Sequence, residues 1–317
     1  DFHLQRLEDS WQCLADDEVN SHEAEKWKLE SKNILVELLS KAEIGLNDLS
    51  SENSSFCKGT IIIVMLTILW QQQQANNDGA NSHNLQQPLI KAHVCSSLLP
   101  SQPLKYDPDP MSAVLAIENP DSSWPSRIGF HPEAKLSSWC RQRRPFEVTL
   151  KKSGIGEVLL VGAGQDDGDV EILEGLITNV FFVYPGGYLR TAHRGVLNGF
   201  ARHLVLQLAE KCGLTTDLSQ TVSLRDCNQW QEVFVTSSTR LVVPVEKIFV
   251  PSYEQDGPTG LSFQQIWSQR LPSKADCGIP FWRQLYIQML SDQYIQRCGD
   301  RGTGFIMNMV SNIWKKT

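Results

Sequence analysis

The spacing of apolar and polar residues divides the first part of the chain into a helical start followed by strands. Residues 1–50 repeat apolar side chains at helical intervals and predict helices. The run Thr60–Trp70 is continuously apolar and rich in β-branched residues, which predicts a buried strand. It is shorter than the roughly 20 apolar residues that a membrane-spanning helix needs, so no membrane span is expected. The Asn- and Gln-rich stretch 71–87 predicts a long loop or a disordered insertion, and shorter strands are expected at 91–94 and 113–116.

The rest of the chain predicts a second group of helices and strands. A helix is expected within 135–151, ahead of a buried strand at 157–161 and an acidic turn at 165–169. Further along, the pattern predicts a helix that stops at Gly213, a strand at 221–224, a helical segment at 228–232, strands at 233 and at 241–243, and a final helix at 262–271.

Within the second group, the stretch 171–202 is the most informative part of the sequence. Val180–Tyr184 is β-branched and aromatic, as in a buried strand, and residues 185–187 have the chemistry of a turn. Tyr188–Thr191 predicts a second strand, and Gly199 stands where a helix begins. A glycine there lets the backbone approach a bound anion, which the first N–H groups and the helix dipole favour. An ordinary turn is the more frequent explanation of such a glycine, so this feature alone does not decide the function.

Composition and charge narrow the class of protein without setting its function. The 317 residues can bury a large core in one or two domains, and 41% hydrophobic with 21% charged residues is typical of globular proteins. The net charge of −7 argues against a nucleic-acid-binding protein, which usually presents a basic face. The basic residues between 141 and 152 are interpreted as a solvated surface.

The eight cysteines indicate neither a metal site nor a disulfide framework. No pair has C-x-x-C spacing, and no Cys/His set has the spacing of a zinc finger. Free thiols in a reducing compartment are the simplest interpretation. We therefore expect an intracellular protein, of the cytoplasm or of an organelle such as a mitochondrion or plastid, rather than a secreted one.

Six segments gain meaning from their combination. They are His-Leu-Gln-Arg-Leu at 3–7, Ala134-Lys135 with a basic run that ends at Glu147, Glu-Gly-x-x-Thr-Asn-x-Phe at 174–181, Leu-x-Gly-x-x-Arg at 197–202, Phe234–Arg240 with Val-Pro-Val at 243–245, and Asp-Gly-Pro-Thr-Gly at 256–260. Together they resemble the fold-type IV (class IV) pyridoxal-phosphate enzymes. These are the branched-chain aminotransferases, D-amino-acid aminotransferases and aminodeoxychorismate lyases. The resemblance covers roughly residues 1–271 and is closest to plant and fungal aminotransferase-like members.

The resemblance implies an α/β (α+β) fold of two domains, like that of D-amino-acid aminotransferase, with the cofactor between them. It implies a small N-terminal α/β domain at 1–118 that lacks the first strands of the family pattern. An interdomain connection at 119–133 and a large cofactor-binding domain at 134–271 would follow. Residues 272–317 extend beyond the pattern and predict amphipathic helices. These helices either pack on the chain's own domain or bind a protein partner.

The resemblance also implies a site for pyridoxal 5'-phosphate. Lys135 is the expected catalytic residue and would hold the cofactor as an internal aldimine, helped by the arginines that follow it, since nearby cations disfavour a charged amine. Glu174 is expected to face the ring nitrogen, and Arg6 to grip the phosphate. Further cofactor contacts are expected from Thr178, Asn179, Gly199, Phe200, Ala201, Ser237 and Ser238.

The implied function is an aminotransferase that acts, as a homodimer, on a small-molecule amino acid and 2-oxo acid pair. A lyase of the aminodeoxychorismate type would use the same cofactor contacts, and an inactive subunit of a larger complex is a third hypothesis. The sequence departs from the family pattern at Trp139-Cys140, where many members have a tyrosine, and at Thr191-Ala192 and Leu197-Asn198, where prolines are usual. These departures concern substrate recognition more than cofactor binding.

Overall fold

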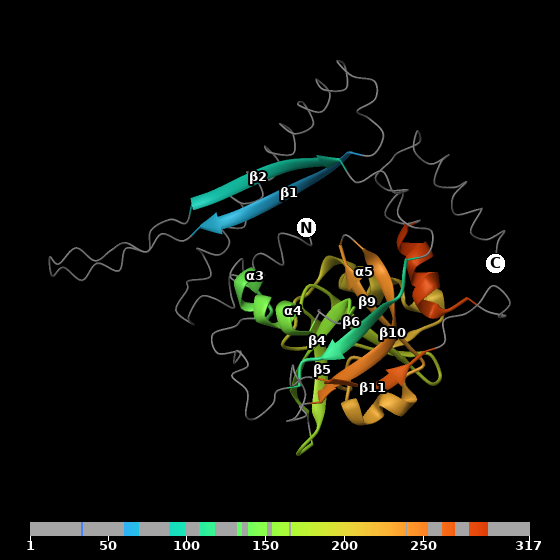
Figure 1. Cartoon of the computed structure of the whole chain (residues 1–317). Helices are drawn as coiled ribbons and strands as arrows, with labels where there is room; N and C mark the ends of the chain where they lie inside the picture. Colours follow the sequence, from blue (N-terminus) through green and yellow to red (C-terminus); the bar gives the residue numbers. More distant parts are fainter. Residues whose placement is uncertain are drawn as a thin grey trace, which may run out of the picture. The chain divides into compact units, whose positions relative to one another are not determined.

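The structure is a computed structural model, and it describes the chain in segments (Figure 1). The described residues are 33, 60–69, 89–98, 108–117, 132–134, 139–150, 154–164, 166–238, 240–252, 262–269 and 279–290. Two predicted site residues, Arg6 and Lys135, lie outside these segments. So do the predicted loop at 71–87 and the motif at 256–260.

The chain divides into two compact units. In the first, β1 (Thr60–Leu69) and β2 (Leu89–Leu98) pair antiparallel, with Thr60 opposite Leu98 and Leu69 opposite Leu89. The strands predicted at 60–70 and 91–94 are therefore confirmed as strands.

The second unit is built on a sheet of nine strands. They are β3 (Met111–Leu115), β4 (Glu157–Ala163), β5 (Val170–Gly175), β6 (Asn179–Tyr184), β7 (Tyr188–Arg190), β8 (Thr215–Thr216), β9 (Glu232–Ser237), β10 (Leu241–Ser252) and β11 (Ser262–Ser268). Because β9 pairs with both β10 and β6, the strands β10, β3, β4, β5, β6 and β9 form a closed ring. β3, which the sequence analysis places before the interdomain connection, is thus part of this larger sheet.

The alternation of side chains along β6 explains why the whole strand is buried. Val180, Phe182 and Tyr184 join the main core, which also contains Trp230 and Trp267. The residues between them point to the opposite face, where Phe181 stacks on Phe234 of β9 with ring centroids 5.2 Å apart. The prediction of a buried strand at 180–184 is confirmed, with side chains covered on both faces.

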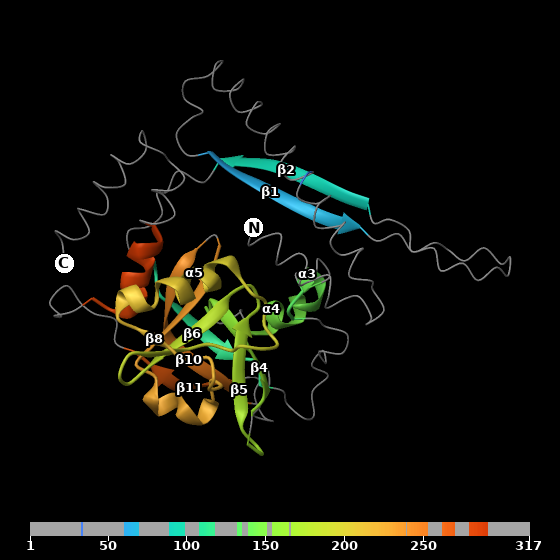
Figure 2. The ribbon, with the colours of Figure 1, turned by 180° about the vertical axis from the view of Figure 1, so that it is seen from behind.

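Short helices cover the outside of the ring (Figures 1 and 2). α3 (Trp139–Gln142) and α4 (Arg144–Leu150) follow one another, and α4 lies against β4 with Phe146 buried beside Val158 and Leu160. α5 (Phe200–Leu208) lies against β9. A 3₁₀ turn, η2 (Glu210–Cys212), extends α5 and ends at Gly213, whose φ of 75° is left-handed, so the predicted stop at Gly213 is confirmed.

A last helix, residues 281–290, packs its apolar side on the chain itself. Trp282, Leu285, Tyr286 and Met289 are buried. Glu232 at the start of β9 caps this helix, because its two carboxylate oxygens accept the N–H groups of Phe281 and Trp282 at 3.1 Å each. An amphipathic helix in this region was predicted, and here it packs within the chain.

Three predicted elements are wrong. Residues 262–271 do not form a helix: 262–268 are the strand β11, which pairs antiparallel with β10, and the Trp267 indole donates to Trp230 O at 3.0 Å. Residues 221–224 form no strand beyond an isolated bridge between Ser223 and Glu171. The helical turn expected at 228–232 begins and ends earlier, as the 3₁₀ helix η3 (Leu224–Gln229), because the Ser223 hydroxyl caps the N–H of Arg225.

Candidate functional site

The turn that joins β5 to β6 brings two of the predicted residues together. Glu174 is the last residue but one of β5, Asn179 opens β6, and the two lie opposite each other as the pair that joins these strands. The N–H of Gly175 donates to Thr178 O at 2.7 Å, which closes the turn. A tight turn of this kind sets both polar side chains on the same side of the sheet.

Glu174 is a buried carboxylate with hydrogen-bond donors around it. The residue is only 6% exposed. Its Oε2 accepts from Asn179 Nδ2 at 3.3 Å and from the Leu197 N–H at 3.0 Å. Two donors on one oxygen suit the ionised form of a carboxylic acid, since that form only accepts.

Asn179 links this acid to the loop before α5. Its Nδ2 also donates to Leu197 O at 2.8 Å, so the Leu197 N–H is held by Glu174 and its carbonyl by Asn179. The Oδ1 of Asn179 lies directly against Gly199, and a Cβ at this position would collide with it. Gly199 is therefore required for close packing rather than for an unusual backbone, since its φ is −70°.

α5 begins at this point with no side chain capping its N-terminus. Gly199 is the N-cap residue, and Phe200 and Ala201 form the start of the first turn, as predicted. The first N–H groups of a helix lack intrahelical acceptors and, with the helix dipole, favour an anion. The structure thus places an anion-favouring helix end two residues after the peptide that contacts the buried acid.

Arg202 is a site residue that the sequence analysis did not single out. It is 7% exposed, and its Nη2 donates to Ala192 O at 3.0 Å while Nη1 lies 3.5 Å from Asn198 Oδ1. Its buried Nε has no partner among the described residues. Burial lowers the pKa of Arg202, and the nearby charge of Glu174 opposes that shift. Its place in the Leu-x-Gly-x-x-Arg segment was the available sequence signal.

Glu157 is a second buried carboxylate near this turn, and the sequence analysis did not predict it. It is fully buried at the start of β4, where its Oε2 accepts the Thr178 hydroxyl at 3.0 Å and Oε1 accepts the N–H of Val158 at 3.0 Å. A side chain at Gly175 would collide with Thr178 Oγ1. Thr178, predicted as a cofactor contact, is used here to hold the turn against β4.

The described residues on either side of Lys135 are both tied to this site. The Glu133 carboxylate accepts the N–H of Gly195 at 3.0 Å. The Trp139 indole donates to Leu176 O, within the β5–β6 turn, at 2.7 Å. Glu133 is thereby tied to the loop before α5, and Trp139 to the turn that carries Glu174.

The predicted residues Ser237 and Ser238 lie at the end of β9. Ser237 Oγ accepts the N–H of Arg240 at 3.2 Å, and Ser238 is exposed. Thr236, one position earlier, lies opposite Asn179, and its buried hydroxyl has no partner within the described chain. Thr236 is therefore the residue of this segment that faces the site.

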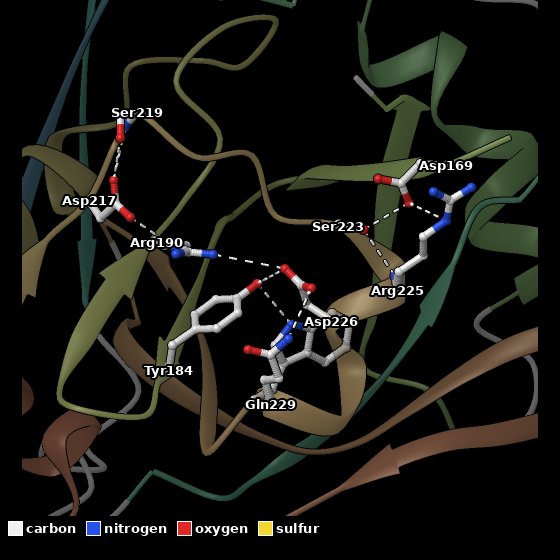
Figure 3. A network of polar contacts seen from close by, with 10 residues as sticks. Asp169, Tyr184, Arg190, Asp217, Ser219, Ser223, Arg225, Asp226 and Gln229 are labelled. Carbon is white, nitrogen blue, oxygen red and sulfur yellow. Dashed lines mark hydrogen bonds and ion pairs between the residues drawn. The ribbon is translucent and has the colours of Figure 1, made fainter. Parts of the chain in front are cut away.

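A second polar cluster lies at the other end of β6 (Figure 3). The Tyr184 hydroxyl accepts the Trp230 indole N–H at 3.1 Å and donates to Asp226 Oδ2 at 3.4 Å. Arg190 pairs with Asp217 at 3.1 Å and lies over the Tyr184 ring, 4.3 Å from its centroid. Burial raises the pKa of Tyr184 to about 12, so this hydroxyl stays protonated at neutral pH.

The described segments contain no group of three or more His, Cys, Asp or Glu side chains placed to hold a metal ion. Nor does any helix in the described part have the length and apolar character needed to cross a membrane.

The sequence and the fold have relatives. Residues 132–248 match the family Amino-transferase class IV. No curated protein matches the sequence significantly. Among solved structures, the branched-chain amino acid aminotransferase from Thermobaculum terrenum in its PLP form is 19% identical with a TM-score of 0.50, and the match covers 78% of this chain and 69% of that chain.

Two further structures are similar. A hypothetical aminotransferase from Mycobacterium tuberculosis, with alpha-ketoglutarate and PMP bound, is 17% identical over 78% of this chain and 74% of that chain, with a TM-score of 0.50. The branched-chain aminotransferase from Thermoproteus uzoniensis with norvaline is 16% identical over 72% of this chain and 64% of that chain, with a TM-score of 0.45. The matches thus span about two thirds of the length of the two branched-chain enzymes. The predicted mixed α/β fold of the fold-type IV aminotransferases is confirmed.

Proposed function

With residues 132–248 matching the amino-transferase class IV family, we propose that this protein is a pyridoxal 5'-phosphate-dependent aminotransferase that moves an amino group between an amino acid and a 2-oxo acid. Bound pyridoxal phosphate supplies an electron sink for negative charge at the substrate's α-carbon. One observation carries the proposal: the Leu197 peptide connects a buried acid, Glu174, to the uncapped start of α5.

The acid suits the ring nitrogen of this cofactor. A pyridine nitrogen stays protonated when a carboxylate faces it, and that carboxylate must remain ionised. Glu174 is buried, and its carboxylate accepts hydrogen bonds from Asn179 and from the Leu197 N–H. These hydrogen bonds favour the charged form of the carboxyl group. In this proposal Glu174 holds the proton on the ring nitrogen, and Asn179 keeps the carboxylate oriented.

The helix start suits the phosphate group. The N–H groups of Phe200 and Ala201 would bind phosphate oxygens, and Gly199 lets the loop lie close to Asn179 without a side chain in between. We propose Arg6 as the cation on this phosphate and Ser237 and Ser238 as further donors. Their roles rest on the motifs in the sequence.

Two unpartnered buried groups support the presence of a ligand. Buried polar atoms are nearly always hydrogen-bonded in folded proteins. Arg202 Nε and Thr236 Oγ1 are two of three such exceptions among the described residues, and the third, Arg143 Nε, lies 3.0 Å from a carboxylate oxygen. Both Arg202 and Thr236 lie near Asn179. Thr236 is opposite Asn179 in the sheet, and Arg202 holds the loop whose Leu197 carbonyl accepts from Asn179. A bound ligand with polar groups would provide hydrogen-bond partners for Arg202 Nε and Thr236 Oγ1.

Lys135 is proposed as the residue that attaches the cofactor and moves the α-proton of the substrate through Nζ. Its neighbours support this role, because Glu133 contacts the loop before α5 and Trp139 contacts the turn that carries Glu174. Proton transfer needs groups held in a fixed position, and both contacts lie within four residues of Lys135 in the sequence.

The test is to record the absorption spectrum of the purified protein with added pyridoxal phosphate, reduce it with borohydride, and map the modified residue by mass spectrometry. We expect a pyridoxyl group on Lys135 and none in Lys135→Ala, while Lys211→Ala, at an exposed position after α5, keeps the modification. A colourless wild-type protein with no modified lysine would refute the proposal and favour an inactive subunit.

The reaction itself is tested by its products. An aminotransferase converts 2-oxoglutarate to glutamate in the presence of a donor amino acid and releases no product without an acceptor. Pyruvate release without an acceptor would contradict this assignment in favour of the lyase type. A panel of branched-chain and D-amino acids as donors would identify the substrate.

The setting of this chemistry is part of the proposal. We propose a homodimer, to be measured by light scattering on the eluted protein, and a reducing compartment inside the cell. Free thiols at Cys140, Cys212 and Cys227 support such a compartment. The helix 281–290 packs on its own chain, so a protein partner of residues 272–317 would have to use other residues of that extension.

A further inference from the structure

The strongest unexplained feature of the site is the burial of the Arg202 guanidinium. A charged group that is 7% exposed needs partners, because burial disfavours its charge. Its Nη2 donates to Ala192 O and its Nη1 reaches Asn198 Oδ1, so one side chain contacts both ends of the loop 192–198. These two contacts are neutral and do not balance a full positive charge.

The negative charge of Glu174 offsets part of this cost. Burial lowers the pKa of Arg202, and the nearby carboxylate opposes that shift without reversing it. The attraction is mutual, so the guanidinium also favours the ionised form of the acid. The two residues hold the same loop from different sides, since Glu174 accepts the Leu197 N–H and Arg202 donates to Ala192 O.

We infer that Arg202 is a positioning residue of the site, which fixes the loop 192–199 and provides the internal counter-ion of Glu174. It acts on the reaction through these two partners. By holding Ala192 and Asn198 it fixes Gly199 and the start of α5, where the phosphate is proposed to bind. This inference deepens the proposed function and rests on it for its catalytic meaning.

The coupling between Arg202 and Glu174 can be measured in the cofactor-free protein. If Glu174 is the counter-ion, Arg202→Met removes the attraction between the two charges, and in a Glu174→Gln background there is no such attraction to lose. In urea unfolding of the cofactor-free protein, we expect R202M to lower the folding equilibrium constant at least about ten-fold more in the wild-type background than in the E174Q background. Changes equal within about two-fold in both backgrounds would overturn the counter-ion role.

Variants with preserved charge or with a remote change sharpen the test. R202K keeps the charge but not the planar donor arrangement, so it should retain most of the coupling to Glu174. R225M removes an exposed arginine that contacts Asp167 O and should show no coupling to Glu174 beyond about two-fold. If R202M does not fold, the inference predicts that R202M with E174Q does fold; failure of both would overturn it.

Cofactor binding separates this inference from the proposed function. We expect the Kd of pyridoxal phosphate, from its absorbance, to rise about ten-fold or more in R202M and to recover to within about three-fold in R202K. Normal affinity in R202M would overturn the positioning role and leave the proposed function intact. A wild-type protein that binds no pyridoxal phosphate refutes the proposed function, while the coupling in the cofactor-free protein still decides whether Arg202 is the counter-ion.

Discussion

The two ends of β6 carry polar clusters of different character. At the Asn179 end, the buried groups contact backbone atoms of a loop, and two of them, Arg202 Nε and Thr236 Oγ1, have no partner among the described residues. At the Tyr184 end, the hydroxyl contacts both Trp230 and Asp226, and no buried atom of this cluster lacks a partner among the described residues (Figure 3).

The difference indicates which cluster is functional. A network whose donors and acceptors satisfy one another stabilises the fold and has nothing left for a ligand. A cluster that leaves buried donors unpaired needs another group to complete it, and such exceptions require an explanation. We therefore assign the Asn179 end to ligand binding and the Tyr184 end to stability. The following substitutions test that division.

The largest expected effect is on catalysis at the Asn179 end. Glu174→Gln removes the proposed partner of the ring nitrogen and should lower kcat by about 10²–10³-fold, the range for one preorganised electrostatic group. Asp226→Asn is the matched change at the Tyr184 end. It weakens a partly exposed pair with Arg190 and should leave kcat unchanged, with a stability loss within about 1 kcal/mol. Similar losses of kcat in both variants would contradict the division.

A smaller effect is expected on cofactor affinity. Gly199→Ala forces a Cβ into Asn179 Oδ1, so either the Asn179 side chain or the backbone at the start of α5 must move. We expect the Kd of pyridoxal phosphate to rise by about ten-fold or more. The control is Gly154→Ala, which meets no atom within 4 Å but has a φ of 77°, so it should lower stability without changing the Kd. Equal Kd values in the two variants would refute the close-packing role.

The sequence predicted the framework of the site because local pattern decides it. The apolar alternation of Val180–Tyr184 and the turn at 185–187 require no knowledge of distant residues. Glu174, Asn179 and Gly199 were predicted from motifs, and the structure brings all three to the Leu197 loop. Motifs could identify them because Glu174 and Asn179 flank a single turn and Gly199 directly precedes α5, so each belongs to a short continuous segment.

The errors and omissions have a common cause in long-range contacts. Residues 262–268 have enough polar positions to be read as a helix, but pairing with β10 makes them an edge strand. Glu157 is 21 positions from the Thr178 hydroxyl that it accepts, and nothing in its local sequence indicates that it is buried. Arg202 stands in a motif, but the sequence does not show that it binds Ala192 O or lies near the charge of Glu174, because these groups come together only in the folded chain.

At the Tyr184 end, a loss of stability without a loss of binding is expected. Tyr184→Phe leaves the Trp230 indole N–H buried without its acceptor, at a cost of about 1–2 kcal/mol in the free energy of unfolding. Urea unfolding measures this loss, and a pyridoxal phosphate titration provides the comparison. The Kd should stay within about two-fold of the wild-type value. A weakened Kd with unchanged stability would assign the Tyr184 cluster to the binding site.

The smallest expected effect concerns pH and the helix 281–290. Burial raises the pKa of Glu232 above its usual 4.5, although the N–H groups of Trp282 and Phe281 oppose this shift. A carboxyl with a raised pKa in the folded state gives stability that is fully present below the unfolded value and is lost as pH rises through the folded value. Glu232→Gln stays neutral throughout. The stability of the wild type relative to this variant should therefore increase as pH falls from about 7 to about 5, by less than about 1 kcal/mol. Urea unfolding at both pH values measures it, and a difference that is constant or of opposite sign would show that the capping hydrogen bonds outweigh burial at Glu232.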